Sequence, residues 1–367
     1  MCAKAAFHGS DLELVARQYG IPQDQIVSFS ANVNPLGISP MLRQGLIDSI
    51  DKVMSYPDRD YTQLREAISG YTGAPADQIL VGGGATEIIS LFIKNLAPKR
   101  VMLVNPTYSE YAREIGLEGG ELISYQLLSE QEFRVDVDDL CSRLDSTFDL
   151  LILCNPNNPT SSAVHRQALR QILAYCRTRN IYVMVDETYA EFAPDLEDIT
   201  AIPLIGEFDN LLVLRGVSKF FAAPGLRLGY GMTSNAGVLS YINSTKNPWT
   251  LNSLAAAAGC RMFADEDYIQ RTRQFTRQEL ERLCALLRQE PGLHVYEPSA
   301  NFVLLRLCKP GITSEMAFEY CIRQGLMIRD CASFPGLGDN HIRFCLNLPE
   351  QNDRLMAALQ SLLRRDG

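Results

Sequence analysis

The chain has 367 residues, of which 46% are hydrophobic and 21% charged, and its formal net charge is −9. This composition is typical of a globular protein, and the length corresponds to about two domains. The acidic balance argues against a large nucleic-acid interface and against binding to anionic membranes, because both need a basic surface. The net negative charge is still compatible with a local basic pocket that binds a small anion.

Ten cysteines are spread along the chain, and no two of them are closer than ten residues. This spacing contains no C-x-x-C pair and is unlike a disulfide framework, so we expect free thiols and no metal site. No apolar run approaches the ~18 residues of a membrane-spanning helix. The first residues lack the apolar core of a signal peptide, so we expect a cytoplasmic protein.

Short hydrophobic runs alternate with helical patterns through the first two thirds of the chain. Five runs are predicted strands, at Ile79–Val81, Arg100–Val104, Leu150–Cys154, Ile181–Val185 and Leu211–Arg215. Each run is almost continuously apolar, as strands buried on both faces are. Helices are predicted between them, at Ala85–Leu96 and His165–Arg179. This alternation predicts an α/β fold with a mostly parallel sheet between helices.

The pattern changes after about residue 260, where a long amphipathic helix is predicted over Asp267–Gln289. Later elements are predicted strands at His294–Tyr296, Phe302–Leu307 and Ile342–Leu346 and helices near Ser314–Gln324 and Gln351–Arg364. We therefore expect a large domain over residues 29–260. A small α+β domain would comprise residues 261–367 together with residues 1–28, which include an N-terminal arm.

Polar motifs follow the ends of the predicted strands, where ligands of open α/β sheets bind. Gly82-Gly83-Gly84 leads into a helix, and such a turn lets a phosphate approach the free N–H groups of a helix N-terminus. It also fits a plain tight turn, and it is not a dinucleotide-binding fingerprint, which disfavours a nicotinamide dehydrogenase. The segment 155–160 (NPNNPT) predicts a stiff turn whose amides either bind a ligand oxygen or only hold the turn.

Two further motifs place charged side chains among apolar residues. Asp186 ends a hydrophobic strand with Tyr189 three residues on, and such a carboxylate either pairs with a protonated ring nitrogen or caps a helix. Lys219 precedes two phenylalanines, and a desolvated lysine has a lowered pKa suited to Schiff-base chemistry. Arg227 follows between two glycines, in a place suited to binding a phosphate.

These four motifs, in this order, resemble those of the fold-type I pyridoxal-phosphate enzymes, and the chain is similar to the aminotransferase class I/II group over nearly its whole length. The resemblance implies pyridoxal 5'-phosphate as cofactor, with Lys219 bonding it covalently and Asp186 facing its pyridine nitrogen. Tyr189 and Asn158 match the residues that bind the ring's phenolic oxygen, and Tyr108 matches the aromatic residue that stacks on the ring. Lys219, Asp186 and Tyr189 would therefore be the catalytic residues.

The resemblance also implies a phosphate site, a shared active site and a carboxylate clamp. The phosphate site would consist of Gly84, Ala85, Thr86, Ser218 and Arg227. Tyr56 matches a tyrosine that reaches the cofactor phosphate of the neighbouring subunit, which implies a homodimer with shared sites. Arg343 matches the arginine that binds the substrate α-carboxylate, with Asn158 also near the substrate.

The chain departs from the family pattern at two positions. The family has Ser or Thr three residues before the lysine, where this chain has Gly216, so one phosphate hydrogen bond is lost or comes from a backbone N–H. The family's N-P-x-G turn ends in Gly, whereas here Ser161 follows Thr160, which predicts a slightly altered turn. Neither departure removes a group that the chemistry needs.

Within the group, the segments resemble those of histidinol-phosphate aminotransferases and threonine-phosphate decarboxylases. The decarboxylases match better at His8-Gly9 and at residues 29–37 (FSANVNPLG), 219–230 (KFFAAPGLRLGY) and 328–337 (IRDCASFPGL). By this resemblance His8, Asn32 and Arg329 would bind the phosphate of the substrate.

The resemblance to the decarboxylases implies conversion of L-threonine O-3-phosphate to aminopropanol phosphate, a step of cobalamin synthesis, with Lys219 as candidate proton donor. Transamination of histidinol phosphate and decarboxylation of L-serine O-phosphate to ethanolamine phosphate stay open as alternatives. The same residues serve all three reactions, and one methyl group separates the two decarboxylase substrates by only ~1–3 kcal/mol. A non-enzymatic sensor would need an attached DNA-binding domain, which we do not expect.

Overall fold

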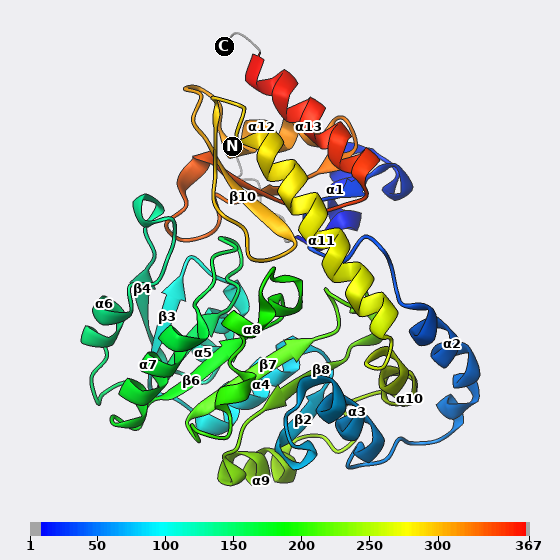
Figure 1. Cartoon of the computed structure of the whole chain (residues 1–367), viewed down its shortest axis with the longest axis vertical. Helices are drawn as coiled ribbons and strands as arrows, with labels where there is room; N and C mark the ends of the chain where they lie inside the picture. Colours follow the sequence, from blue (N-terminus) through cyan, green and yellow to red (C-terminus); the bar gives the residue numbers. More distant parts are fainter. Residues whose placement is uncertain (1–8, 365–367) are drawn as a thin grey trace.

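A seven-stranded sheet organises the lower half of the molecule in the computed structural model, which describes residues 9–364 (Figure 1). The strands are β2 (Ile79–Gly82), β3 (Arg100–Asn105), β4 (Glu121–Gln126), β5 (Leu150–Cys154), β6 (Tyr182–Asp186), β7 (Leu211–Gly216) and β8 (Gly229–Met232). Their order across the sheet is β2-β8-β7-β6-β5-β3-β4. Only β8 runs antiparallel to its neighbours, so the predicted mostly parallel α/β sheet is confirmed.

Side chains of successive strand residues enter two different hydrophobic clusters, one on each face of the sheet. In β5, Leu151 and Leu153 belong to one cluster, whereas Leu150 and Ile152 belong to the other. This alternation explains why the strand sequences are apolar throughout, since a strand residue points to the opposite face from its neighbour.

Helices cover both faces of this sheet. On one face lie α4 (Ala85–Leu96), α5 (Ser109–Leu117) and α9 (Ala236–Thr245). The other face carries α3 (Thr62–Thr72), α6 (Val137–Ser142), α7 (Arg166–Arg177) and α10 (Ser253–Met262). The remaining helices of this part are α2 (Pro40–Asp48) and the short α8 (Leu196–Ile199). The sequence predicted α4 and α7 to within two residues at each end, and it did not predict the others.

A second, antiparallel sheet lies above the first in Figure 1. Its order is β12-β13-β10-β9, formed by β9 (Leu293–Val295), β10 (Phe302–Leu307), β12 (Arg329–Asp330) and β13 (His341–Cys345). The surrounding helices are α11 (Glu266–Leu287), α12 (Ser314–Ile322) and α13 (Pro349–Arg364). Apart from β12, which the sequence did not predict, these elements follow the order that the sequence predicts after residue 260.

The N-terminal segment packs against this second part. Val15 and Ala16 of α1 (Leu12–Tyr19) share a hydrophobic cluster with Leu283 of α11. The short β1 (Val27–Ser28) pairs in parallel with β11 (Leu326–Met327). The division into domains at residues 29–260 and at 1–28 with 261–367 stays a prediction.

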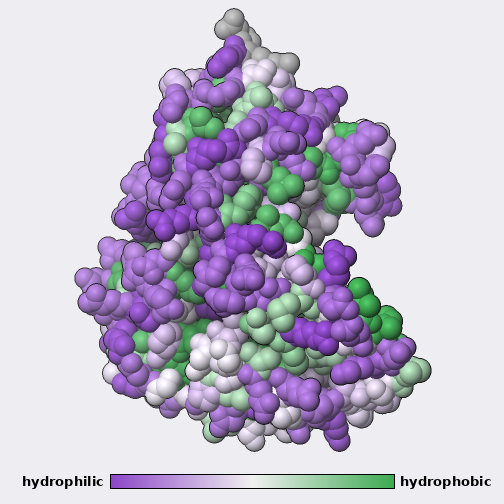
Figure 2. Space-filling model, turned by 45° about the vertical axis from the view of Figure 1, so that its right-hand side comes forward, coloured by the Kyte–Doolittle hydropathy of each residue, from purple (hydrophilic) through white to green (hydrophobic). Residues whose placement is uncertain are grey.

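The face of the molecule shown in Figure 2 is mainly hydrophilic, and hydrophobic residues form separate patches on it, one of them at the right-hand edge of its lower half. Between residues 9 and 364, no helix combines the length and the apolar character that crossing a membrane requires.

Candidate active site

A cavity of about 740 Å³ lies where the carboxyl ends of the parallel strands meet the second sheet. Asn105, Cys154, Asp186 and Gly216, which end β3, β5, β6 and β7, all line it. Twelve of the predicted site residues are in its wall: Asn32, Ala85, Thr86, Tyr108, Asn158, Asp186, Tyr189, Ser218, Lys219, Arg227, Arg329 and Arg343. The parallel topology therefore gathers motifs that are far apart in the chain.

Lys219 lies in the turn that follows β7, next to the buried ring of Phe220. Its Nζ donates a hydrogen bond to the carbonyl oxygen of Ala31 at 2.6 Å. Desolvation, followed by the nearby charge of Arg343, lowers the pKa of Lys219 to about 8. The amine is therefore neutral, and thus nucleophilic, in a far larger fraction of molecules at neutral pH than an ordinary lysine is.

Asp186 is buried at the end of β6, 4% exposed, and its two carboxylate oxygens have different partners. One accepts a hydrogen bond from the hydroxyl of Tyr111 at 2.6 Å, and the other accepts one from the backbone N–H of Thr188 at 2.9 Å. Burial raises the pKa of Asp186. A cationic partner in the cavity would favour the ionised carboxylate, so the position suits a protonated ring nitrogen.

Tyr189 and Asn158 lie on the turns after β6 and β5, in contact with residues of other segments. The hydroxyl of Tyr189 accepts a hydrogen bond from Nδ2 of Asn32 at 3.2 Å. Oδ1 of Asn158 accepts one from Nη1 of Arg343, whose Nη2 donates to the carbonyl oxygen of Ser30 at 2.7 Å. Asn32 is thus held by Tyr189 and Arg343 by Asn158, and both partners line the cavity in which a ligand would bind.

The start of α4 forms a narrow recess beside Arg227. Gly84 has φ 101°, a backbone conformation that strains any residue with a Cβ, and a Cβ there would also displace the guanidinium of Arg227, whose Nη2 would lie 2.5 Å away. Gly84 itself is not in the wall of the cavity, but Ala85 and Thr86 are. A Cβ on Gly216 would come within 3.1 Å of the Cβ of Ala85. Close packing on α4 therefore accounts for the glycine where the family has Ser or Thr.

Two arginines stand next to each other on the second sheet. Arg329 of β12 and Arg343 of β13 are paired residues of the antiparallel ladder. Desolvation and the neighbouring Arg343 lower the pKa of Arg329. Nε of Arg343 is buried and has no hydrogen-bond partner among the described residues. Two close guanidinium groups, one with a free donor, favour a ligand that carries two anionic groups.

Besides Gly84, one described residue of the predicted site, Tyr56, does not line this cavity. The side chain of Tyr56 is 79% exposed, and its ring packs on that of Trp249 with 4.8 Å between centroids. His8 lies outside the described residues.

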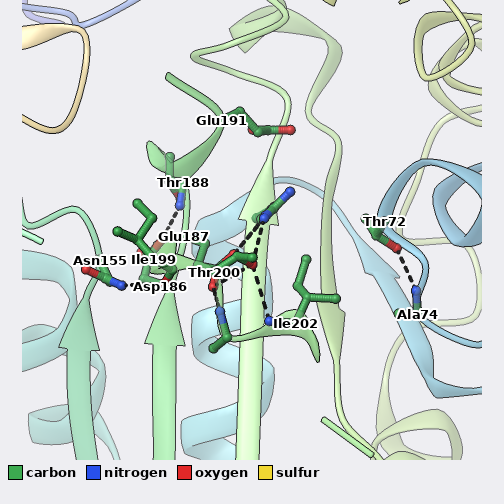
Figure 3. A network of polar contacts seen from close by, with 12 residues as sticks. Thr72, Ala74, Asn155, Asp186, Glu187, Thr188, Glu191, Ile199, Thr200 and Ile202 are labelled. Carbon is green, nitrogen blue, oxygen red and sulfur yellow. Dashed lines mark hydrogen bonds and ion pairs between the residues drawn. The ribbon is translucent and has the colours of Figure 1, made fainter. Parts of the chain in front are cut away.

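A buried ion pair that the sequence did not predict involves Glu187, the neighbour of Asp186 in the chain (Figure 3). Oε2 of Glu187 accepts hydrogen bonds from Nε and Nη2 of Arg215 at 3.0 and 2.7 Å. The hydroxyl of Thr200 donates to the same oxygen at 2.9 Å. The only available signal was the unusual Asp-Glu pair at the end of a buried strand, since both charges need partners there.

We expect Arg215→Met to lower the free energy of unfolding by about 3–5 kcal/mol, because it leaves the carboxylate of Glu187 buried without its partner. Urea denaturation measures this change. The matched control is Arg170→Met, which breaks the exposed ion pair with Glu207 and should cost at most about 1 kcal/mol. Equal losses in the two variants would contradict the role given to the buried pair.

A lysine and a carboxylate at the strand ends of a mostly parallel sheet, with arginines opposite, define a fold-type I pyridoxal-phosphate enzyme. The chain belongs to the aminotransferase class I and II family, whose model matches residues 24–359. This confirms the resemblance that the ordered motifs predicted.

Several relatives are similar to almost the whole chain. The threonine-phosphate decarboxylase of Salmonella typhimurium is 36% identical over 356 residues, which are 97% of this chain and 96% of the relative. The histidinol-phosphate aminotransferase of Methanothermobacter thermautotrophicus is 31% identical over 359 residues, 97% of this chain and 94% of the relative. The crystal structure of the histidinol-phosphate aminotransferase from Clostridium acetobutylicum has a TM-score of 0.85 at 29% identity and covers 91% of this chain and 98% of its own.

The cofactor of this protein is pyridoxal 5'-phosphate. The cavity offers a group for each part of that molecule. A lysine with a lowered pKa suits its aldehyde, and a buried carboxylate suits its ring nitrogen. The N-terminus of α4 beside Arg227 suits its phosphate. The residues therefore fit the cofactor.

We expect the covalent capture of pyridoxal 5'-phosphate by the cofactor-free protein to follow the titration of Lys219. Because only the neutral amine attacks, the rate constant should rise about tenfold per pH unit below the pKa of about 8 and level off above it. Stopped-flow absorbance between pH ~6 and ~10 measures this dependence. A rate constant that keeps rising until pH ~10 would show an ordinary lysine instead.

Proposed function

We propose that this protein is a pyridoxal-phosphate-dependent carboxy-lyase that converts L-threonine O-3-phosphate to aminopropanol phosphate, a step of cobalamin synthesis. The observation that carries the proposal is the pairing of Arg329 with Arg343 in the cavity that contains Lys219. The substrate has two anionic groups, a carboxylate and a phosphate, on either side of its amine. The similarity to the decarboxylase of Salmonella typhimurium supports the same assignment.

In this proposal each part of the cofactor has its own set of residues. Lys219 would bond the aldehyde carbon, Asp186 would face the ring nitrogen, and Tyr108 would stack on the ring. The hydroxyl of Tyr189 and the side-chain amide N–H of Asn158 would donate hydrogen bonds to the phenolic oxygen. The phosphate is bound by Gly84, Ala85, Thr86, Ser218 and Arg227.

The substrate is held at its two anionic ends. Arg343 binds the α-carboxylate together with Asn158, with which it is already hydrogen-bonded. Arg329 and Asn32 bind the phosphate, and His8, which lies outside the described residues, is assigned to the same group. Fixing both ends sets the rotation about the bonds of Cα, and this rotation decides which of its bonds breaks.

Decarboxylation breaks the bond between Cα and the carboxylate carbon and leaves an electron pair on Cα. The bound cofactor supplies the electron sink for this pair. Arg343 has to orient the carboxylate without preventing its loss. Lys219, which lines the same cavity, is the candidate proton donor to Cα.

Transamination of histidinol phosphate is the second candidate. The relatives from Methanothermobacter thermautotrophicus and Clostridium acetobutylicum bear that name. Glutamate, a common amino donor, also has two anionic groups that a pair of arginines would bind. L-serine O-phosphate is a third possibility for the decarboxylase, since it lacks only one methyl group.

The test is to incubate the purified enzyme with each of the three phosphorylated substrates, with and without 2-oxoglutarate. We expect carbon dioxide and aminopropanol phosphate from L-threonine O-3-phosphate without any keto acid. Comparison of kcat/KM for the serine and threonine compounds then identifies the better substrate. Glutamate formed from histidinol phosphate and 2-oxoglutarate, with no carbon dioxide from either amino acid, would refute the proposal.

The proposal includes a homodimer with shared sites. Six apolar side chains between residues 41 and 56 are exposed: Met41, Ile47, Ile50, Val53, Met54 and Tyr56. Exposed apolar side chains of this kind suit contact with a second copy of the chain. The partner subunit's Tyr56 would then reach the cofactor phosphate, which explains why Tyr56 is far from its own cavity.

Mixed dimers test the shared site. The Tyr56→Phe and Lys219→Ala variants are each impaired, but their hybrid has one site with both native residues if Tyr56 acts across the interface. We expect activity to rise above the sum of the two parents when they are mixed. No rise from a confirmed hybrid would refute the assignment of Tyr56.

We also place the reaction in the cytoplasm, which agrees with the nine free cysteines among the described residues.

A further inference from the structure

We propose that Ser161 is a positioning residue that ties the turn carrying Asn158 to the segment before β10, and that it thereby helps to set the substrate-binding side of the site. This inference rests on the proposed function for the roles of Asn158 and Asn32. Ser161 itself does not line the cavity. It stands where the family's turn has glycine.

The backbone of Ser161 has the conformation that glycine would favour. Its φ is 61°, in the left-handed region, and the residue is completely buried. Its backbone N–H donates to the carbonyl oxygen of Asn157 at 2.7 Å, which closes the turn. A residue with a Cβ in this conformation is strained unless its surroundings hold it there.

The hydroxyl of Ser161 makes contacts that glycine could not make. Its Oγ accepts hydrogen bonds from the backbone N–H groups of Ser299 and Ala300, both at 3.0 Å. The carbonyl oxygen of Ser161 accepts a further one from Ser299 at 2.9 Å. Ala300 is completely buried, so without the hydroxyl its N–H group would lose this partner away from water.

Further hydrogen bonds lead from residues 299 and 300 to the substrate side of the cavity. Asn301, next to Ala300, donates from Nδ2 to the carbonyl oxygen of Asn32 at 3.1 Å. Asn32 in turn donates to Tyr189. Ser161 thus connects the turn of Asn158 with the segment that supports Asn32.

The same turn is also anchored on its other side. Nδ2 of Asn157 donates to the carbonyl oxygen of Pro106 at 2.8 Å, and Oδ1 of Asn157 accepts from the hydroxyl of Thr107 at 3.0 Å. The segment that carries Tyr108 is therefore fixed to the turn independently of Ser161. Loss of the Ser161 hydroxyl should therefore make residues 299–301, which support Asn32, more mobile. The segment that carries Tyr108 should stay fixed.

The test compares the holoenzyme of the wild type with Ser161→Gly, which suits the left-handed backbone and removes only the hydroxyl contacts. We expect backbone hydrogen exchange at residues 299–301 to increase at least tenfold, with unchanged exchange at residues 105–108. We also expect KM for L-threonine O-3-phosphate to rise about tenfold, with kcat changed less. Ser161→Ala, which keeps Cβ, should show the same local change.

The control is Ser162→Ala, because the Ser162 hydroxyl contacts Thr160 in the same turn and not residues 299–301. It should leave both exchange and KM unchanged. Unchanged exchange at residues 299–301 in Ser161→Gly, or increased exchange with an unchanged KM, would overturn the proposal. If the wild type does not decarboxylate threonine phosphate, the proposed function fails. The dissociation constant of pyridoxal 5'-phosphate, to which Asn158 contributes, then replaces KM as the readout for Ser161.

Discussion

Lys219→Ala abolishes turnover, with an expected loss of about 10⁴-fold or more in kcat, and removes the visible absorbance band of the covalently bound cofactor. Among the described residues that line the cavity, Lys219 is the only lysine, so no second amine replaces it. In the proposed reaction the same substitution also removes the candidate proton donor to Cα. Purified protein with added pyridoxal 5'-phosphate is measured by absorbance and by product formation.

The control for this experiment is Lys94→Ala, on the exposed side of α4. It should keep the absorbance band and the full activity. A Lys219→Ala protein that retains the band, or more than a tenth of the wild-type rate, would contradict the assignment of the covalent lysine.

Asp186→Asn should lower kcat by about 10²–10³-fold, because the amide keeps the shape of the carboxylate but not its charge opposite the ring nitrogen. In contrast to this loss of activity, the substitution should stabilise the cofactor-free protein. Burial raises the pKa of Asp186, so in the cofactor-free protein the folded state binds the proton more tightly than the unfolded state. Ionisation of Asp186 therefore lowers stability as the pH rises above the unfolded pKa of ~3.9.

Urea denaturation of the cofactor-free protein at pH ~5 and ~8 measures this second effect. The free energy of unfolding of Asp186→Asn should equal or exceed that of the wild type at the higher pH. Asp209→Asn, an exposed substitution, should change neither quantity. A variant that keeps more than half of kcat would show that the charge of Asp186 is not needed.

Within the seven-stranded sheet, the sequence predicted five strands and missed β4 and β8. The strand β4 (ELISYQ) lies at the edge of the sheet and is partly exposed, so its sequence is not continuously apolar. In β8 (GYGM), Gly231 makes room for Phe92, and Gly229 makes room for the backbone of Gly84. Glycines chosen for close packing weaken the pattern from which a strand is recognised.

Site residues could be predicted where a side chain of a chemically distinctive type stands at the end of a predicted strand. Lys219 and Asp186 could be found in this way, and the parallel topology explains why they meet. Arg343 was assigned from the family resemblance alone, and it lies within β13 of the antiparallel second sheet. The contacts that hold them could not be predicted, since they join residues far apart in the chain. The hydroxyl of Tyr111, in α5, donates a hydrogen bond to Asp186 at the end of β6, and the carbonyl oxygen of Ala31 accepts one from Lys219.

The reaction type is tested most directly with L-threonine O-3-phosphate that carries deuterium at Cα. Decarboxylation leaves the bond between Cα and its hydrogen intact, whereas transamination breaks it. We therefore expect mass spectrometry to find the deuterium retained in the aminopropanol phosphate, with one carbon dioxide released per product and no requirement for a keto acid. Loss of the deuterium to water, accompanied by glutamate formed from added 2-oxoglutarate and by no carbon dioxide, would contradict the proposed function.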